Sequence, residues 1–295
     1  SSEGKAAIST GGDGNVTIEL DGDNTGKSGN NHAGVEKNNG GNLTIADADA
    51  DGALEAVGGK YGAGIGGGTS ARDASDITIT GGDIEAFGGE QAAGIGGGES
   101  GDGSNITIKD GNVKAVGGET SYGKNGGAGI GGGAFGAGSD ITINGGDVEA
   151  IGGDGGAGIG GGRGYGYSEK GSDITITDGN VIARGGEGAA GIGGGLGSDG
   201  FDITIGGGNV EAEGGAWAAG IGASSGGSGY NITISGDAQV KASGGERFDG
   251  GSTTAISGTP NTANLTTGSI GYYAPGADKG QEAPEKLLHN DGSGA

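Results

Sequence analysis

The sequence has no cysteine, no methionine and only 3 prolines in 295 residues. The lack of cysteine excludes disulfide bonds and thiol chemistry. No apolar run is long enough to cross a membrane as a helix, and no signal peptide can be recognised. Because a complete cytosolic chain would begin with methionine, we expect a processed product or an excised fragment.

Cationic and aromatic residues are also scarce. The chain carries 15 Lys and Arg against 38 Asp and Glu, which gives a formal net charge of −23. This balance disfavours nucleic acids and anionic membranes as partners, and we expect no membrane insertion. A solvated acidic surface explains the charge, although such a surface can also attract divalent cations. With 1 Trp, 7 Tyr and 4 Phe, the position of each aromatic residue is informative.

Glycine is the abundant residue, with 85 copies. A collagen helix would need glycine at every third position and much more proline, so collagen is excluded. Disorder is the other structure expected of a chain rich in glycine and serine. The regular recurrence of Ile, Val and Ala disfavours disorder and indicates a repeated, packed unit.

Three short motifs recur in a fixed order. The first Ile of Asp/Asn-Ile-Thr-Ile lies at 77, 106, 141, 174, 203 and 232, with spacings of 29, 35, 33, 29 and 29 residues. A Val/Ile-Glu-Ala type motif follows most copies, and then a Gly-Ile-Gly motif centred on Ile65, Ile95, Ile130, Ile159, Ile192 and Ile221. A three-part unit repeated about every 30 residues is typical of a stacked solenoid.

Each motif alternates apolar and polar residues with period two, which predicts strands, and glycine corners separate the motifs. We therefore expect an all-β protein, a right-handed parallel β-helix with three short strands per coil and about 8–9 coils. Residues 1–40 are expected to form degenerate N-terminal coils or a cap, residues 41–268 the regular repeats, and residues 269–295 a C-terminal cap or tail. Stacking should place like residues over like, with Ile77 over Ile106.

Two outer columns of this β-helix are candidates for binding. The first is a threonine ladder of Thr78, Thr107, Thr142, Thr175, Thr204 and Thr233, which either reflects β-propensity or offers a regular array to ice or a crystalline polysaccharide. The second contains Asp140, Asp173 and Asp202, whose stacked carboxylates should repel one another. Capping by backbone N–H groups is the more frequent solution, and a bound Ca²⁺ is the alternative. The glycine motif was expected to give a third face of bare backbone, open to close approach by a ligand or required by tight corners.

The irregular corners at 119–127 and 163–172 and the aromatic residues are the other candidates, because insertions in solenoids form surface loops. Phe201 and Tyr230 replace serines of other coils, so we expect them to stack on each other. Exposed aromatic rings on a polar scaffold are the usual platform for sugars, although rings can also plug a corner or mediate subunit contacts. The candidate binding residues are Tyr122, Arg163, Tyr165, Tyr167, Lys170, Phe201, Trp217 and Tyr230.

No catalytic residue is predicted. The chain lacks a phosphate-binding glycine loop, and neither His32 nor His289 is accompanied by a nucleophile. Cleavage of polysaccharides would need opposed carboxylates or a cationic base, for which the corner holding Arg163 and Lys170 is the best location.

The repeats Ser-Asp-Ile-Thr-Ile, Gly-Gly-Asp-Val-Glu-Ala and Gly-Gly-Ala-Gly-Ile-Gly-Gly-Gly, over about residues 40–257, resemble the glycine-rich parallel β-helix repeats of secreted and wall-attached proteins of Gram-positive bacteria. The resemblance implies an extracellular, adhesive or carbohydrate-binding role. We therefore expect a non-catalytic surface or matrix module that binds polysaccharide or cell-surface glycan, or copies of itself. The alternatives are a polysaccharide lyase or glycoside hydrolase, a filament subunit that docks end to end, and an ice-binding protein.

Overall fold

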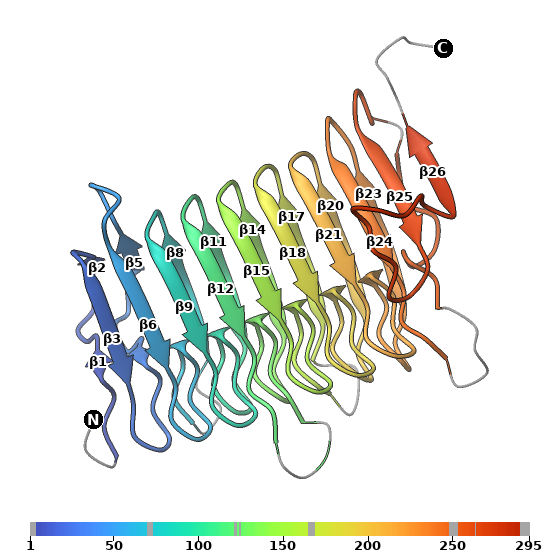
Figure 1. The fold of residues 1–295 in the computed structure, drawn as a ribbon. Helices are drawn as coiled ribbons and strands as arrows, with labels where there is room; N and C mark the ends of the chain where they lie inside the picture. Colours follow the sequence, from blue (N-terminus) through green and yellow to red (C-terminus); the bar gives the residue numbers. More distant parts are fainter. Residues whose placement is uncertain are drawn as a thin grey trace.

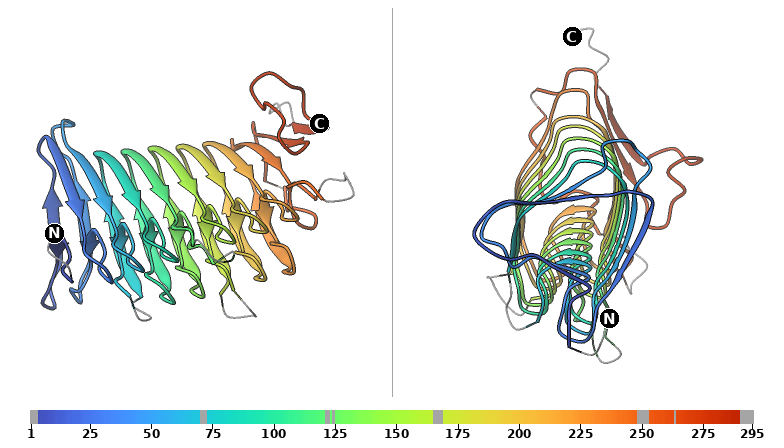
Figure 2. Two further views of the ribbon diagram at one scale, coloured as in Figure 1. Left: turned by 60° about the horizontal axis from the view of Figure 1, so that its bottom comes forward. Right: turned by 90° about the vertical axis from the view of Figure 1, so that its left-hand side faces the viewer.

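The chain folds as a parallel β-solenoid. The computed structural model describes residues 4–69, 73–120, 123, 125–164, 169–247, 253–262 and 264–289, and these residues contain strands and turns but no α-helix. The coils follow one another in a single row from the N-terminal to the C-terminal end (Figure 1). Seen end-on, the middle coils lie over one another, whereas the N-terminal coils have a different outline (Figure 2, right). None of the described elements is a helix long and apolar enough to span a bilayer.

Three sheets run along the stack, one for each sequence motif. Sheet A holds the Gly-Ile-Gly motif, sheet B the Asp-Ile-Thr-Ile motif and sheet C the Val-Glu-Ala motif. Sheet A consists of β1 (Ile8–Ser9), β4 (Val35–Glu36), β7 (Ile65–Gly66), β10 (Ile95–Gly96), β13 (Ile130–Gly131), β16 (Ile159–Gly160), β19 (Ile192–Gly193) and β22 (Ile221–Gly222). Sheet B consists of β2 (Val16–Glu19), β5 (Leu43–Ala46), β8 (Ala74–Ile79), β11 (Gly103–Ile108), β14 (Gly138–Ile143), β17 (Gly171–Ile176), β20 (Gly200–Ile205) and β23 (Gly229–Ile234). Sheet C consists of β3 (Asp23–Lys27), β6 (Ala53–Val57), β9 (Asp83–Phe87), β12 (Asn112–Val116), β15 (Asp147–Ile151), β18 (Asn180–Arg184), β21 (Asn209–Glu213), β24 (Gln239–Ser243), β25 (Ser269–Tyr273) and β26 (Lys286–His289).

The strands pair in the register expected from the repeat. Ile77 pairs with Ile106 and Thr78 with Thr107 between the parallel strands β8 and β11, and the same correspondence continues along sheet B. The inward side chains form aliphatic columns that are almost completely inaccessible to water. Burial of these columns supplies the main stabilisation, at roughly 25 cal/mol for each Å² of apolar surface removed from water. The predicted three-stranded parallel coil is confirmed.

The glycine motif does not form an outer face. Residues 62–68 and 92–98, which contain β7 and β10, are buried throughout. A Cβ on Gly96 would lie 2.0 Å from the carbonyl oxygen of Gly131 in the next coil, and one on Gly97 would lie 2.0 Å from the oxygen of Gly101. Tight packing of backbone against backbone therefore explains the glycines. The expectation of a bare glycine surface open to a ligand is wrong.

The C-terminal segment, of which residues 253–262 and 264–289 are described, covers the last coil. β25 continues sheet C in parallel to β24, whereas β26 pairs antiparallel with β25 at the edge of the sheet (Figure 1). Single bridges from Ile221 to Ile256 and from Thr233 to Asn261 extend sheets A and B by one position each. The loop between β25 and β26 projects from this end of the stack (Figure 2, left).

Candidate functional site: a groove along sheet B

The aspartate and asparagine column of sheet B has a left-handed backbone. The φ angles of its members are 59° at Asp76, 49° at Asn105, 52° at Asp140, 54° at Asp173, 53° at Asp202 and 53° at Asn231. Asp and Asn adopt this conformation more readily than other non-glycine residues, because their short polar side chains can bond locally. The ladder pairing skips these positions, so each strand bends here. Backbone geometry thus explains why the column contains only Asp and Asn.

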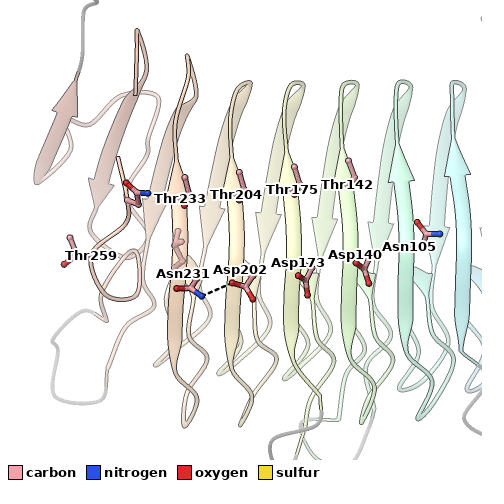
Figure 3. Close-up of a pocket in the computed structure, with 12 residues that line it drawn as sticks. Asn105, Asp140, Thr142, Asp173, Thr175, Asp202, Thr204, Asn231, Thr233 and Thr259 are labelled. Atoms are coloured by element: carbon pink, nitrogen blue, oxygen red, sulfur yellow. Dashed lines mark hydrogen bonds between the residues drawn. The ribbon is translucent and has the colours of Figure 1, made fainter. Parts of the chain in front are cut away.

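A groove of about 850 Å³ follows this line of bends. Figure 3 shows the carboxylates and amides along one side and the threonine ladder along the other. The groove extends from Asn105 in β11 to Asn231 in β23 and ends against Thr259 and Asn261 of the C-terminal segment. Among the described residues that line it are three carboxylates and several hydroxyl and amide groups, but no cationic side chain. The predicted threonine ladder therefore exists, and Thr142, Thr175, Thr204 and Thr233 lie in a hollow.

The carboxylates of the column differ in their partners. Asn105 donates a hydrogen bond of 2.5 Å from Nδ2 to Asp76 Oδ1, and Asn231 donates one of 2.9 Å to Asp202 Oδ1. Lys37 lies near Asp76: partial burial lowers the pKa of Lys37 below its usual value, and the charge of Asp76 raises it in part. Within the part of the chain that the structure describes, Asp140 and Asp173 have no hydrogen-bond partner for their side chains. The middle of the groove is therefore its most negative part.

Backbone capping by aspartate is found in a different column. Asp73 Oδ1 accepts a hydrogen bond of 2.9 Å from the N–H of Asp102, and Asp102 Oδ1 accepts one of 2.7 Å from the N–H of Ala137. Asp199 makes the equivalent bond of 2.7 Å with the N–H of Ser228. Burial raises the pKa of Asp102, the bond from Ala137 opposes this rise, and the charges of Asp73 and Glu169 add to it. Backbone capping was expected of Asp140, Asp173 and Asp202, but near Asp202 it is made by Asp199, three positions earlier. The corresponding positions before Asp140 and Asp173 hold Ala137 and Lys170, so neither of them supplies a capping aspartate.

An aromatic platform adjoins the groove. Phe201 and Tyr230 stack as expected, with ring centroids 4.8 Å apart and an angle of 6° between the ring planes. Each ring directly precedes a member of the aspartate and asparagine column in the chain, Asp202 or Asn231. The platform therefore lies on the strands that carry the C-terminal end of the groove, although neither ring is among the residues that line the groove. Tyr230 is 44% exposed. Lys170 Nζ lies 5.3 Å from the centroid of Phe201, in cation–π geometry.

Of the other predicted binding residues, the structure describes Arg163 and Trp217, and neither lines this groove. Tyr122, Tyr165 and Tyr167 lie outside the described residues. Trp217 lies at a glycine corner of the stack, where the guanidinium of Arg247 is 5.5 Å from its ring centroid. Arg163 is half-buried, and its backbone oxygen accepts a hydrogen bond of 2.7 Å from the N–H of Phe135. Of the cationic corner, Lys170 is the residue that reaches the platform.

An acidic group that the sequence interpretation missed lies between sheets B and C. Carboxylate oxygens of Asp47, Asp49 and Asp51 lie within 4.8 Å of one another. The charges of Asp51 and Asp47 raise the pKa of Asp49, with Asp51 as the larger cause. The signal was present as Asp47-Ala-Asp49-Ala-Asp51-Gly52, which matches the first six positions of a calcium-binding loop, although Gly58 stands where that pattern has its final Glu. Among the described residues these three could share a cation, and Ca²⁺ at Asp140, Asp173 and Asp202 stays a prediction.

Comparison with known proteins bears on the fold. Five segments match the model of a family described as beta helix repeat: residues 77–99, 106–134, 141–163, 174–196 and 203–229. Each segment begins at the first Ile of an Asp/Asn-Ile-Thr-Ile motif and extends through the following Gly-Ile-Gly motif, so each match covers one coil. No curated protein and no solved structure matches the chain. Over these five coils the chain is similar to parallel β-helix repeat proteins.

Proposed function

We propose that this β-solenoid is a non-catalytic module that binds an extended glycan along the groove of sheet B. The observation that carries the proposal is the stacked pair of Phe201 and Tyr230 on strands β20 and β23, which also carry the C-terminal end of a long polar groove. An exposed aromatic ring can cover the apolar face of a sugar, while hydroxyl, amide and carboxylate groups bond its hydroxyls. Both kinds of group are present here in a rigid arrangement.

The shape of the groove favours a polymer over a small molecule. It is open along its length, and an Asp or Asn and, in four coils, a Thr recur along it from coil to coil. The spacing between paired strands is about 4.8 Å. An extended chain can contact several coils in the same way. A hollow is a poor match to flat ice, so the threonine ladder supports glycan binding better than ice binding. The resemblance of the repeats to secreted and wall-attached proteins favours a place at the cell surface or in a matrix.

Binding would be tested on a glycan array, followed by titration of the best oligosaccharide into the chain and its Tyr230→Ala variant. We expect the variant to bind roughly fivefold to 150-fold more weakly, because stacking on an aromatic ring contributes about 1–3 kcal/mol. Tyr61→Ala is the matched control, since Tyr61 lies at a glycine corner under Lys60, 4.9 Å from its ring centroid. Equal affinity of Tyr230→Ala and the unchanged chain would contradict the proposal.

The absence of catalysis is tested in the same samples. A bound oligosaccharide should be recovered at its original length after prolonged incubation, with no new reducing ends. If reducing ends accumulate, and if Arg163→Ala or Lys170→Ala stops their release, the chain is an enzyme of the lyase or hydrolase type and the proposal is wrong on this point.

A further inference from the structure

The charge pattern of the groove selects among glycans. The lining has Asp140, Asp173 and Asp202 in three successive coils, and no lysine, arginine or histidine among its described residues. Lys37 and the amide of Asn105 compensate Asp76 at one end, and the amide of Asn231 bonds Asp202 at the other. The carboxylates of Asp140 and Asp173 are exposed and without a partner in the described part of the chain.

These carboxylates form a row parallel to the axis of the stack. Adjacent strands lie about 4.8 Å apart, so the charges recur along the stack axis at the distance between coils. Like charges at this spacing repel one another, and a ligand that places a positive charge between them relieves the repulsion. A glycan made of uronic acids would meet the opposite situation, because its carboxylates would face those of the groove.

We propose that the groove takes a linear glycan bearing protonated amino groups, and that Asp140 and Asp173 bind its ammonium groups while the Phe201 and Tyr230 platform holds a sugar ring. This inference rests on the proposed glycan-binding function and names the class of glycan. An ammonium group supplies three N–H donors to the unpartnered carboxylates. The threonine hydroxyls opposite, including Thr142 and Thr175, can bond the sugar hydroxyls.

The chain offers its own conservative substitution for a test. Asn105 and Asn231 belong to the same column and have the same left-handed backbone, with φ of 49° and 53°. Asp140→Asn with Asp173→Asn therefore removes two charges and keeps the backbone and the size of the side chains. The control is Glu85→Gln with Glu119→Gln, which removes two exposed charges outside the groove.

The ligands form a matched pair: oligosaccharides of β-1,4-linked glucosamine, and the same oligosaccharides fully N-acetylated. Titration calorimetry would be run at mildly acidic pH, where the amines of the oligosaccharide are protonated, first with a chelator and then with Ca²⁺. We expect the chain to bind the amine form at least about tenfold more tightly than the acetylated form, since hydrogen bonds between charged groups are stronger than those between neutral groups. The double Asn variant should bind both forms with similar affinity, and the control should behave like the unchanged chain.

Each other outcome has a defined meaning. Equal binding of both forms by the unchanged chain, or a preference that survives in the double Asn variant, overturns the inference but leaves glycan binding intact. A preference lost equally in the Glu85 and Glu119 control shows a general effect of the net charge and also overturns it. If a polyuronate binds more tightly than the amine form and its binding requires Ca²⁺, the inference is overturned, and the ligand is an acidic glycan bridged to the carboxylates by the metal. If the unchanged chain binds no saccharide on the glycan array, or binds one with the same affinity as Tyr230→Ala, the proposed function itself fails.

Discussion

The left-handed backbone conformation of each member explains the composition of the aspartate and asparagine column. Asp173 has φ of 54°, a value at which a β-branched side chain is strained. The sequence interpretation took the alternation of Asp and Asn in this column as a question of charge. Alternation of polar residues carries no direct signal of φ, so the left-handed conformation, and the bend that it causes, were not foreseen.

Substitution at Asp173 separates backbone from charge. Asp173→Asn should leave the free energy of unfolding almost unchanged, whereas Asp173→Val should lower it by about 1–2 kcal/mol because the left-handed conformation is costly for Val. Urea denaturation measures both. Thr175→Val, at an ordinary strand position two residues later, is the control and should cost little. Equal stability of the Asn and Val variants would exclude the backbone explanation.

Asp49 gives a second prediction for a single residue. Because the charges of Asp51 and Asp47 raise its pKa in the folded state, protonation of Asp49 favours folding. The repulsion is therefore relieved as pH falls through the raised pKa and is present in full above it. Asp49→Asn should raise the melting temperature at neutral pH and low salt, and the gain should shrink with added salt and at acidic pH. Asp21→Asn is the control, and an equal gain there would show that only the net charge matters.

At the scale of elements, the two-residue strands of sheet A are held by close backbone contacts. Their glycines were assigned correctly to the coil, but their burial was not predicted, because a motif without side chains gives no periodicity to indicate inside and outside. The approach of carbonyl groups from the next coil decides it, as at Gly96 and Gly131. A surface of bare glycine backbone is consequently not available for binding.

Gly96→Ala tests the close packing. Its Cβ would lie 2.0 Å from the oxygen of Gly131, and Gly96 has φ of 131°, so both a clash and backbone strain result. We expect a loss of about 3 kcal/mol or more in the free energy of unfolding. Gly14→Ala is the control, since a Cβ there meets nothing within 4 Å. If both variants melt at the same temperature, sheet A is not tightly packed.

At the scale of the whole molecule, an ion network fixes the C-terminal segment to sheet C. Lys114 pairs with Glu149 at 3.3 Å, and Arg184 joins Glu149 at 2.8 Å to Glu213 at 3.0 Å. Lys279, whose side chain is 2% exposed, contacts Glu213 and lies 3.5 Å from Glu211. Lys114 and Glu149 are register partners in the neighbouring strands β12 and β15. The contribution of Lys279 was not predicted, because it lies in the part of the chain that lacks the repeat.

Burial would raise the pKa of Glu213, but Lys279 and Arg184 outweigh burial and hold it below its usual value. For a carboxylate with a lowered folded-state pKa, the stabilisation is present above the unfolded pKa of about 4.3 and is lost as pH falls through the folded value. Acidification should therefore loosen the C-terminal segment. Hydrogen exchange of β25 and β26 as a function of pH measures this, and exchange that does not change with pH would contradict it.

Lys279→Met tests the same contact at neutral pH. The substitution leaves Glu213 and Glu211 without their buried partner, and we expect a loss of about 2 kcal/mol, between the values for exposed and buried pairs. Limited proteolysis should then cut the C-terminal segment faster. Lys27→Met removes an exposed pair with Glu55, at 3.0 Å, and should cost less than about 1 kcal/mol. Equal protease resistance of both variants would show that Lys279 does not hold the segment.

The position of the C-terminal segment also bears on assembly. β25, β26 and the bridges at Ile256 and Asn261 cover the last coil, so a second copy could not stack there without displacing them. End-to-end filament formation stays a prediction of the sequence, and light scattering over a range of concentrations would test it. The covered end favours a function along the side of the stack.

The repeat alone specified a parallel solenoid, three strands per coil, their register and the stacking of Ile77 over Ile106, because period two and coil length leave one way to bury the apolar residues. It also indicated the pairing of Phe201 with Tyr230. The groove, the burial of the glycine motif and the contact of Lys279 came from the folded chain. They depend on φ at single residues, on the distance between neighbouring coils and on contacts across the end of the stack. None of these features produces a periodic pattern in the sequence from which it could have been predicted.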